Sequence, residues 1–495
     1  MKRGARIVLV MLVVAYAALL VPASEPTVPT TDQAQGTKKA FAWNQDNFWA
    51  GIEKEYVAAK RTECEGTNRS ADSLIAVAKS KIEYLSGRQL EPGDPAFRVL
   101  ENSIFQIGSL TAACPDRVVV FKELAEENRK AIKHQSEHWD MSRQETRETL
   151  YRLLYGSRGA MEEVLLHIPT NSIGDPLTLG VDEPSQTPWA SILGVKIHSG
   201  DILISRGGAA TSALIARGND FPGNFSHVAL AYVDPKTHVM SIIEAHIERG
   251  VAISTPEQYL EDTKLRVMVL RLRNDLPQIR ADSMLPHKAA EFALITARGK
   301  HIPYDFSMDF HDHTKWFCSE VASFAYESFG VQLWMGLSHV SSPGLRTWLG
   351  SFGVEHFETQ EPSDLEYDPQ LWVVAEWRDP DQLRKDHYDN AVTEAMLDGA
   401  EAGERLTYPW YMLPVGRGAK AFSSVMNFFG TTGPVPEGMS ASAALRNKYY
   451  SAKHAAIKLE LTRLAEDFET QKGYAPPYWG LLQMARKAKQ TVEQR

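Results

Sequence analysis

Three features are scarce in this chain of 495 residues. Long apolar runs are missing apart from residues 7–21, which excludes a multi-span membrane protein. Positive charge is outweighed, because 53 Lys and Arg accompany 62 Asp and Glu, for a net charge of −9. A phosphate-backbone partner is therefore disfavoured, and we predict no nucleic-acid ligand. Cysteine occurs only three times, so each thiol is informative.

The N-terminus has the features of a secretory signal. A basic start precedes the apolar run over 7–21, which is short for a helix that spans a bilayer. We predict a signal peptide over 1–24, cleaved near Ala23 or Ser24, and a flexible leader over 25–40. The chain is then exported, to a bacterial periplasm or to the outside of the cell. Membrane contact is expected only if the N-terminal segment is retained.

Export places the three cysteines in an oxidising compartment. Cys64 and Cys114 both lie in the first helical region, whereas Cys318 lies in a segment of different character. The simplest partition is a disulfide between Cys64 and Cys114, with Cys318 free. The alternative is three reduced, buried cysteines, because free cysteine is commonly a small core residue.

The hydrophobic period divides the chain into regions. Apolar residues recur at helical spacing over 41–168, as at Leu74, Ala78, Ile82 and Leu85. Proline and glycine are dense over 169–190, which predicts a linker. Helical periodicity returns in a C-terminal region over 379–495.

The middle region, 191–378, has a mixed pattern. Short β-branched or apolar runs predict strands over 201–205, 228–233, 239–245, 265–272 and 371–377. Helices are predicted over 289–298 and 318–329. We therefore predict an α+β domain with a small antiparallel sheet, flanked by N-terminal and C-terminal helical regions.

Two of the predicted strands form a hairpin that pairs an imidazole with a carboxylate. If residues 234–237 form the loop, His227 lies directly opposite Glu244, with Cβ atoms about 4.5–5.5 Å apart. The carboxylate can then hold one ring nitrogen. A two-residue shift in register would place His246 opposite His227 instead. The alternative role of His227 is a structural histidine.

The predicted helix over 318–329 begins at a cysteine. Unpaired N–H groups and the positive end of the helix dipole favour thiolate there. We therefore expect Cys318 to have a pKa below the reference of about 8.5.

Short motifs around these residues resemble a known family. Gly-x-x-x-Pro-Tyr at 299–304, followed by Phe-Cys-Ser-Glu-Val at 317–321, resembles the nucleophile half of NlpC/P60 cysteine peptidases. In this chain the histidine strand precedes the cysteine, which is similar to the circularly permuted branch, the YiiX/YebB-like hydrolases related to lecithin:retinol acyltransferases. The branch's Gly-Asp-Ile-Leu, Ser-His-Val, Ile-Glu-Ala and Cys-Ser-Glu are matched at 200–203, 226–228, 243–245 and 318–320. The resemblance covers about 195–378.

The resemblance implies a permuted papain-like catalytic domain and a role for each matched residue. Cys318 is implied as the nucleophile, His227 as the general base and Glu244 as the residue that orients the base. Tyr304 is implied near the oxyanion, with packing as the alternative role. Separately, Arg206 lies in the connection after the first predicted strand and is a candidate to bind a substrate carboxylate, a solvated loop being the alternative.

The predicted activity is cysteine hydrolysis of an amide bond through a thioester, without a cofactor. The substrate is a peptide or an acyl compound, and the resemblance implies peptidoglycan stem peptides. One alternative is an acyltransferase or a lipid or ester hydrolase of the same superfamily. Another is a non-catalytic module whose helical regions bind an envelope protein.

One polar cluster raises the question of a metal site. Its residues are His301, Asp305, Asp309, His311, Asp312 and His313. Their spacing matches no usual zinc signature, so we predict no metal and expect a polar rim of the cleft. His311 or His313 is the alternative base if the hairpin register differs.

Overall fold

The computed structural model describes residues 10–11, 13–14, 16–21, 46–334 and 338–495. The predicted cleavage site and the leader over 25–40 lie outside the described residues, as does the basic start of the signal. Among the described residues, no helix is both long and apolar enough to cross a bilayer.

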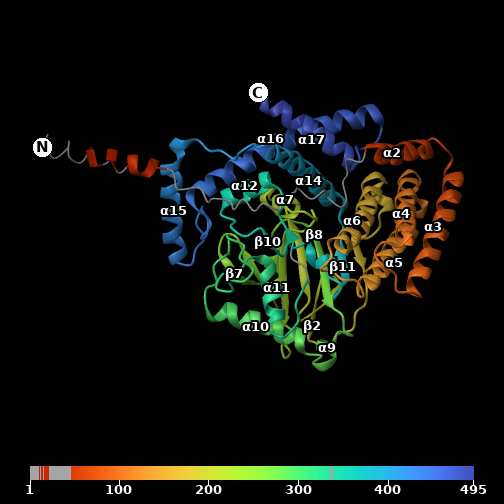
Figure 1. Cartoon of the computed structure of the whole chain (residues 1–495), viewed down its shortest axis with the longest axis horizontal. Helices are drawn as coiled ribbons and strands as arrows, with labels where there is room; N and C mark the ends of the chain where they lie inside the picture. Colours follow the sequence, from red (N-terminus) through yellow and green to blue (C-terminus); the bar gives the residue numbers. More distant parts are fainter. Residues whose placement is uncertain (1–9, 12, 15, 22–45, 335–337) are drawn as a thin grey trace.

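Antiparallel helices form the N-terminal region, at one end of the molecule (Figure 1). They are α2 (Asp46–Lys60), α3 (Cys64–Ser86), α4 (Pro95–Ala113), α5 (Val118–Ser136) and α6 (Gln144–His167). Local sequence sets where α4 begins: the Asp94 side chain accepts a hydrogen bond from the Ala96 N–H, and Pro95 occupies the first helical position. Proline is suited to that position because its missing N–H would have no helical partner.

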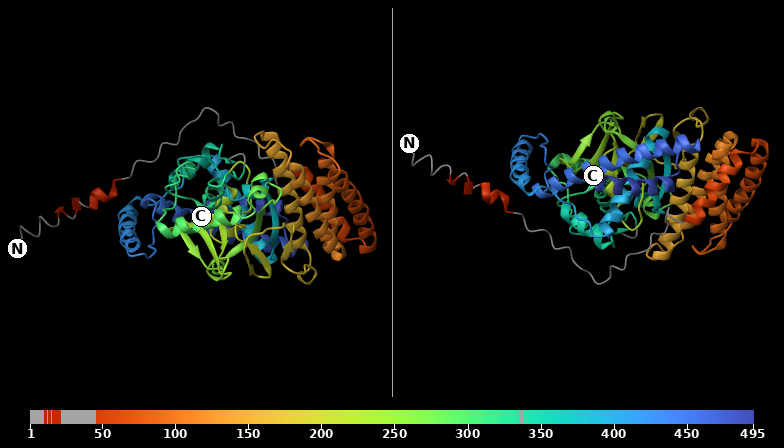
Figure 2. Two further views of the ribbon diagram at one scale, coloured as in Figure 1. Left: turned by 90° about the horizontal axis from the view of Figure 1, so that it is seen from below. Right: turned by 90° about the horizontal axis from the view of Figure 1, so that it is seen from above.

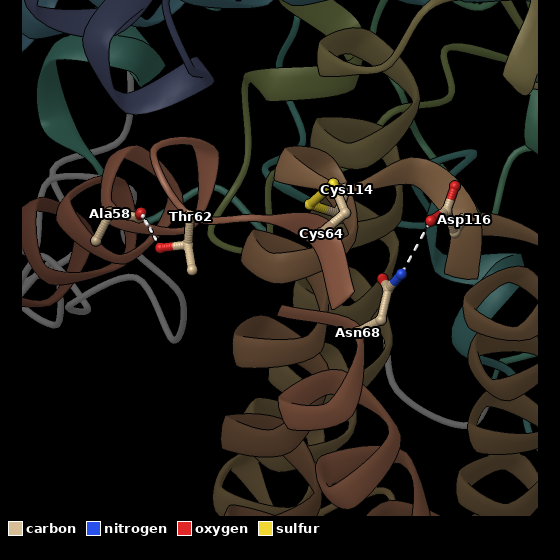
Figure 3. Close-up of a disulfide and its surroundings, with 6 residues drawn as sticks. All are labelled: Ala58, Thr62, Cys64, Asn68, Cys114 and Asp116. Atoms are coloured by element: carbon tan, nitrogen blue, oxygen red, sulfur yellow. Dashed lines mark hydrogen bonds between the residues drawn. A yellow bond between two sulfur atoms is a disulfide. The ribbon is translucent and has the colours of Figure 1, made fainter. Parts of the chain in front are cut away.

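A disulfide joins Cys64 to Cys114, as the sequence predicts, and Cys318 is a free, buried thiol. Cys64 begins α3 and Cys114 follows the last residue of α4, so the bond ties the ends of two packed helices (Figure 3). Beside it, the Asn68 side-chain amide donates a 2.9 Å hydrogen bond to Asp116.

The α+β prediction is confirmed, because the described residues contain a sheet of seven strands whose neighbours all pair antiparallel. Its order is β1-β11-β8-β4-β5-β6-β7. The strands are β1 (Leu177–Leu179), β4 (Ile202–Gly207), β5 (His227–Val233), β6 (Met240–His246), β7 (Gly250–Ser254), β8 (Lys264–Leu272) and β11 (Leu371–Trp377). β1 lies inside the segment 169–190 that the sequence predicts as a linker, so part of this segment belongs to the sheet.

Both faces of the sheet are covered. Along β4, Ile202 and Ile204 belong to one buried cluster and Leu203 to another, as the alternation of a strand requires. The helices α10 (Leu285–Gly299) and α11 (Cys318–Glu327) pack on the face of Ile202. The opposite face packs against a ribbon of β2 (Trp189–Ile192) and β3 (Val195–His198).

Shorter elements connect the strands. They are α7 (Ala210–Arg217), α8 (Pro256–Glu261), α9 (Pro277–Ala281), β9 (Ser338–His339), α12 (Pro343–Phe352), β10 (Glu358–Thr359) and α13 (Asp364–Tyr367).

Four α-helices follow β11 among the described residues, and all except the second lie over the sheet domain (Figure 2). They are α14 (Pro380–Glu401), α15 (Leu413–Phe428), α16 (Ala441–Lys472) and α17 (Tyr478–Glu493). α14 contacts β8, α7 and α6, so it joins the sheet domain to the N-terminal helices. The C-terminal region is therefore packed onto the sheet domain.

Candidate active site

Cys318 is the first residue of α11. The Glu320 carboxyl group accepts a 2.9 Å hydrogen bond from the Phe317 N–H, which satisfies a backbone donor at the helix start. The backbone N–H groups of the first turn, including that of Cys318, have no partner within the helix. The sequence therefore places the thiol beside backbone donors of a helix start, among which the N–H of Ser319 favours the thiolate.

The packing of α11 on β5 brings Cys318 to the strand that carries His227. The Cys318 Sγ lies 4.0 Å from the carbonyl oxygen of Ser226, the residue immediately before His227. Cys318 is only 5% exposed. Two segments that are about 90 residues apart in sequence thus meet at the start of β5.

Glu244 on β6 lies between two imidazoles. Its Oε2 is 2.9 Å from His227 Nε2, and its Oε1 is 3.2 Å from His246 Nε2. Ser254 Oγ on β7 donates a 2.8 Å hydrogen bond to the same Oε1. The carboxylate that was predicted to hold His227 is in contact with it.

The predicted register of this hairpin is wrong by two residues. Glu244 lies opposite Ala229, so His227 contacts it diagonally and its ring lies near that of His246, with 5.9 Å between ring centroids. The cause is a longer loop: β6 begins at Met240, and His238 adopts the left-handed conformation with φ 56°. The Asp234 side chain accepts hydrogen bonds from backbone N–H groups within this loop.

Charge and burial act in opposite directions on the His227 and Glu244 pair. Burial alone would raise the pKa of Glu244, but hydrogen bonds from His227 and His246 hold it well below its usual range. Burial lowers the pKa of His227, and Glu244 opposes that change. The site therefore holds an ionised carboxylate beside an imidazole that is neutral at neutral pH.

The expectation of a lowered thiol pKa is wrong for this structure. Burial raises the pKa of Cys318 to about 12, and the charge of Glu361 acts in the same direction. Backbone N–H groups of Val228 and Ser319 favour the thiolate but do not outweigh burial. The resting thiol is consequently protonated.

Glu361 is a site residue that the sequence did not reveal. Its neighbour Gln360 accepts a hydrogen bond from Ser323 of α11, and Ser363 Oγ accepts one from the Phe225 N–H at 2.9 Å. Glu361 is thus held between the helix of the nucleophile and the segment that leads into β5. Its buried Oε2 has no hydrogen-bond partner among the described residues.

Burial also raises the pKa of Glu361 well above its usual value. No sequence motif marks this residue, because long-range packing alone brings it near the thiol. Its position makes it the main carboxylate that opposes ionisation of Cys318.

Tyr304 lies near the thiol of Cys318. It forms an isolated parallel bridge with Trp316, two residues before Cys318. Burial raises the pKa of Tyr304, and the Cys318 side chain contributes in the same direction. Tyr304 also lines a cavity of about 350 Å³, whose far wall includes Ser440 and Arg446 of the C-terminal region. The C-terminal helices therefore help to shape the space next to the site.

Arg206 does not line a cleft, contrary to prediction. It lies within β4, is fully buried, and its Nε is 3.1 Å from Asp386 Oδ1 on α14. The predicted connection is in fact a strand that continues to Gly207, so the arginine faces the C-terminal helix. Arg217, the last residue of α7, pairs with Glu394 at 2.8 Å. Both guanidinium groups serve packing between regions.

The polar cluster before α11 is dispersed. His301 contacts Glu437 at 2.7 Å, His313 stacks on the ring of Phe324, and Asp305 accepts hydrogen bonds from Ser307. Among the described residues, no group of three or more His, Cys, Asp or Glu is arranged to hold a metal ion.

Comparison with known proteins gives one match. Residues 196–374 match the model of a family described as permuted papain-like amidase enzyme, YaeF/YiiX, C92 family. No curated protein and no solved structure matches the chain.

Proposed function

We propose that this protein cleaves an amide bond with Cys318 as its nucleophile, because residues 196–374 match the model of a permuted papain-like amidase family. His227 is the general base and Glu244 holds its ring. The observation that carries the proposal is the meeting of α11 and β5, where a free thiol at a helix start lies next to the residue that precedes a carboxylate-bound histidine.

The proposed reaction begins with a proton transfer, because the resting thiol and imidazole are both neutral. Glu244 occupies Nε2 of His227, which leaves Nδ1 to take the thiol proton as sulfur attacks the carbonyl carbon. Glu244 stabilises the imidazolium that forms. The backbone N–H of Cys318 donates to the oxyanion.

The tetrahedral intermediate then collapses to a thioester. His227 returns its proton to the leaving amine, and the carbon–nitrogen bond breaks. The neutral imidazole next removes a proton from water, whose oxygen attacks the thioester carbonyl. The products are a carboxylic acid, an amine and the regenerated thiol.

We place this reaction outside the cytoplasm, on peptide amides such as peptidoglycan stem peptides. The Cys64–Cys114 disulfide supports export, because disulfides persist in oxidising compartments. The N-terminal sequence supports it independently. The cavity beside Tyr304 supports a substrate larger than a single amide group.

The test is hydrolysis of a panel of muropeptides and acyl esters by the purified full chain. Cys318→Ala and His227→Ala should each lower turnover by about 10³-fold or more, and Glu244→Gln should cost no more than His227→Ala. Ser328→Ala, an exposed change at the other end of α11, is the matched control and should retain full activity.

Trapping the acyl-enzyme intermediate distinguishes the thioester mechanism from the alternatives. A mass increase on Cys318 that equals the acyl part of the substrate supports the thioester mechanism. Turnover that survives Cys318→Ala would overturn it, and cleavage of esters but not amides would favour the acyl-ester hydrolase instead.

A further inference from the structure

The helix α15 carries an apolar stripe that faces solvent. Its five members recur at helical spacing from the turn before α15 to the residue after it, and each is between 56% and 74% exposed: Tyr411, Val415, Phe422, Val425 and Phe429. Beside them, Phe428 is 85% exposed. We call these five residues the α15 stripe. Large apolar side chains on a surface helix ordinarily face the core, so this arrangement is unusual.

The opposite side of α15 is the one that packs on the protein. Leu413, Pro414, Gly416 and Ser423 are buried there. Gly416 lies so close to α16 that an added Cβ would be 3.1 Å from the Leu445 side chain. The helix α15 already packs on the protein through its other side. The exposure of the α15 stripe therefore does not result from a loosely packed helix.

The charged residues in the stretch of sequence that contains the stripe are all basic. Residues 405–436 contain Arg405, Arg417 and Lys420 and no Asp or Glu, within a chain of net charge −9. Trp410, 67% exposed, lies at the N-terminal end of the helix beside Tyr411. Apolar residues with flanking cations and aromatic rings are the features of a helix that lies in a membrane interface.

The position of α15 in the molecule is consistent with this feature. It lies at the end of the molecule opposite α2–α5, beside the described part of the N-terminal apolar segment (Figures 1 and 2). Arg417 donates hydrogen bonds to the main-chain oxygens of Ala18, Leu19 and Val21 in that segment. Two exposed apolar surfaces are thus gathered at one end.

We propose that the α15 stripe docks on a bilayer that contains anionic lipid, with the helix lying in the interface. A second copy of the chain fits less well, because a two-fold contact through this helix would bring Arg417 and Lys420 of the two copies toward one another. The site beside Cys318 would then be presented to substrates at a membrane surface. This proposal does not depend on the hydrolase activity.

The test measures membrane contact at the stripe itself, because the full chain also carries the N-terminal apolar segment. The fluorophore nitrobenzoxadiazole is attached to Phe429→Cys and, as a matched control, to Leu459→Cys on α16, at positions 74% and 75% exposed. Vesicles of phosphatidylcholine with phosphatidylglycerol should shift the emission to the blue at position 429 and not at 459. Brominated lipid should quench the emission only at 429.

Two further comparisons complete the test. Phe422→Ser with Val425→Ser should reduce the shift at 429 severalfold, whereas Val119→Ser with Ile295→Ser, equally exposed elsewhere, should not. No shift at 429, or an equal shift on pure phosphatidylcholine, overturns the proposal. A shift that depends on protein concentration without vesicles also overturns it, in favour of self-association.

Discussion

At the residue scale, the thiol of Cys318 is controlled by two opposing sets of groups. Backbone N–H groups at the start of α11 and β5 favour the thiolate, whereas burial and Glu361 disfavour it. Burial is the larger effect, so the helix start does not by itself activate the sulfur. A substrate that displaces solvent and brings a carbonyl to the site therefore meets a thiol that needs its base.

Glu361→Gln should lower the thiol pKa of Cys318, because a carboxyl group that ionises only at raised pH beside the thiol is replaced by an amide of the same shape that cannot ionise. The measurement is the rate of iodoacetamide alkylation across the alkaline range, with Cys318 as the free thiol. Glu358→Gln changes an exposed carboxylate in the same segment and should leave the curve unchanged. An identical curve for Glu361→Gln would show that this carboxylate does not act on the thiol.

The sequence predicted the contact between His227 and Glu244 but not the state of Cys318. The two residues lie on adjacent strands of one hairpin, so the local sequence was enough to predict their contact. The thiol pKa depends instead on how deeply α11 is buried and on Glu361. Hydrogen bonds of the nearby Gln360 and Ser363 hold the segment of Glu361 close to the site. Neither property is encoded near Cys318 in the sequence.

At the element scale, the start of α11 depends on a buried carboxyl. Burial raises the pKa of Glu320 to about 9, and the charges of Asp305, Asp309 and Asp312 act in the same direction. The group therefore stays neutral in the folded protein while it ionises in the unfolded chain above its ordinary value of 4.5. Between these two pKa values Glu320 is ionised in the unfolded chain and neutral in the folded protein. The free energy of unfolding of the wild type therefore falls as pH rises through this range.

Glu320→Gln should remove this loss, because the amide oxygen can still accept the hydrogen bond of Phe317. The variant should gain stability over the wild type as pH rises from 5 to 8, by at most about 1.4 kcal/mol per pH unit. Urea unfolding at both pH values measures the difference. Glu327→Gln, exposed on the same helix, should show no such trend, and a trend of opposite sign for Glu320→Gln would contradict the assigned protonation state.

The disulfide acts on the pairing of α3 with α4. It closes a sequence separation of 50 residues, which restricts the unfolded chain. Replacing Cys64 and Cys114 together by Ala should lower the free energy of unfolding by about 2–4 kcal/mol. Reducing agent should lower the thermal midpoint of the wild type and leave that of the double variant unchanged. Equal stability of the two proteins would mean that the bond does not restrict the unfolded chain.

Element boundaries were predicted well where the hydrophobic periodicity was regular. They were missed where they depended on the length of a loop. The predicted strand over 265–272 differs by one residue from β8, which has a long apolar run. The hairpin register failed because the left-handed turn at His238 extends the loop beyond 234–237. Loop geometry of this kind depends on the hydrogen bonds that the Asp234 side chain accepts from the backbone N–H groups of Lys236 and Thr237, which periodicity does not show.

At the scale of the whole molecule, buried ion pairs join the three regions. Arg206 on β4 and Arg266 on β8 lie directly opposite each other, and Asp386 of α14 contacts both. Arg266 also pairs with Glu162 of α6, at 2.7 Å between Nη2 and Oε2. His387 of α14 contacts the same Glu162 at 2.9 Å. Sequence reasoning assigned Arg206 to a substrate because its partner lies 180 residues away.

Asp386→Ala should therefore destabilise the whole molecule and not only α14. It leaves two buried arginines without their shared carboxylate, which costs about 3–5 kcal/mol. Urea unfolding measures the loss, and Asp381→Ala, an exposed change on the same helix, should have little effect. Hydrogen exchange locates the loss: amide protection should fall in α6 and β8 as well as in α14, because the ion pairs cross all three. A loss confined to α14 would show that the helix docks on the sheet without coupling it to the N-terminal helices.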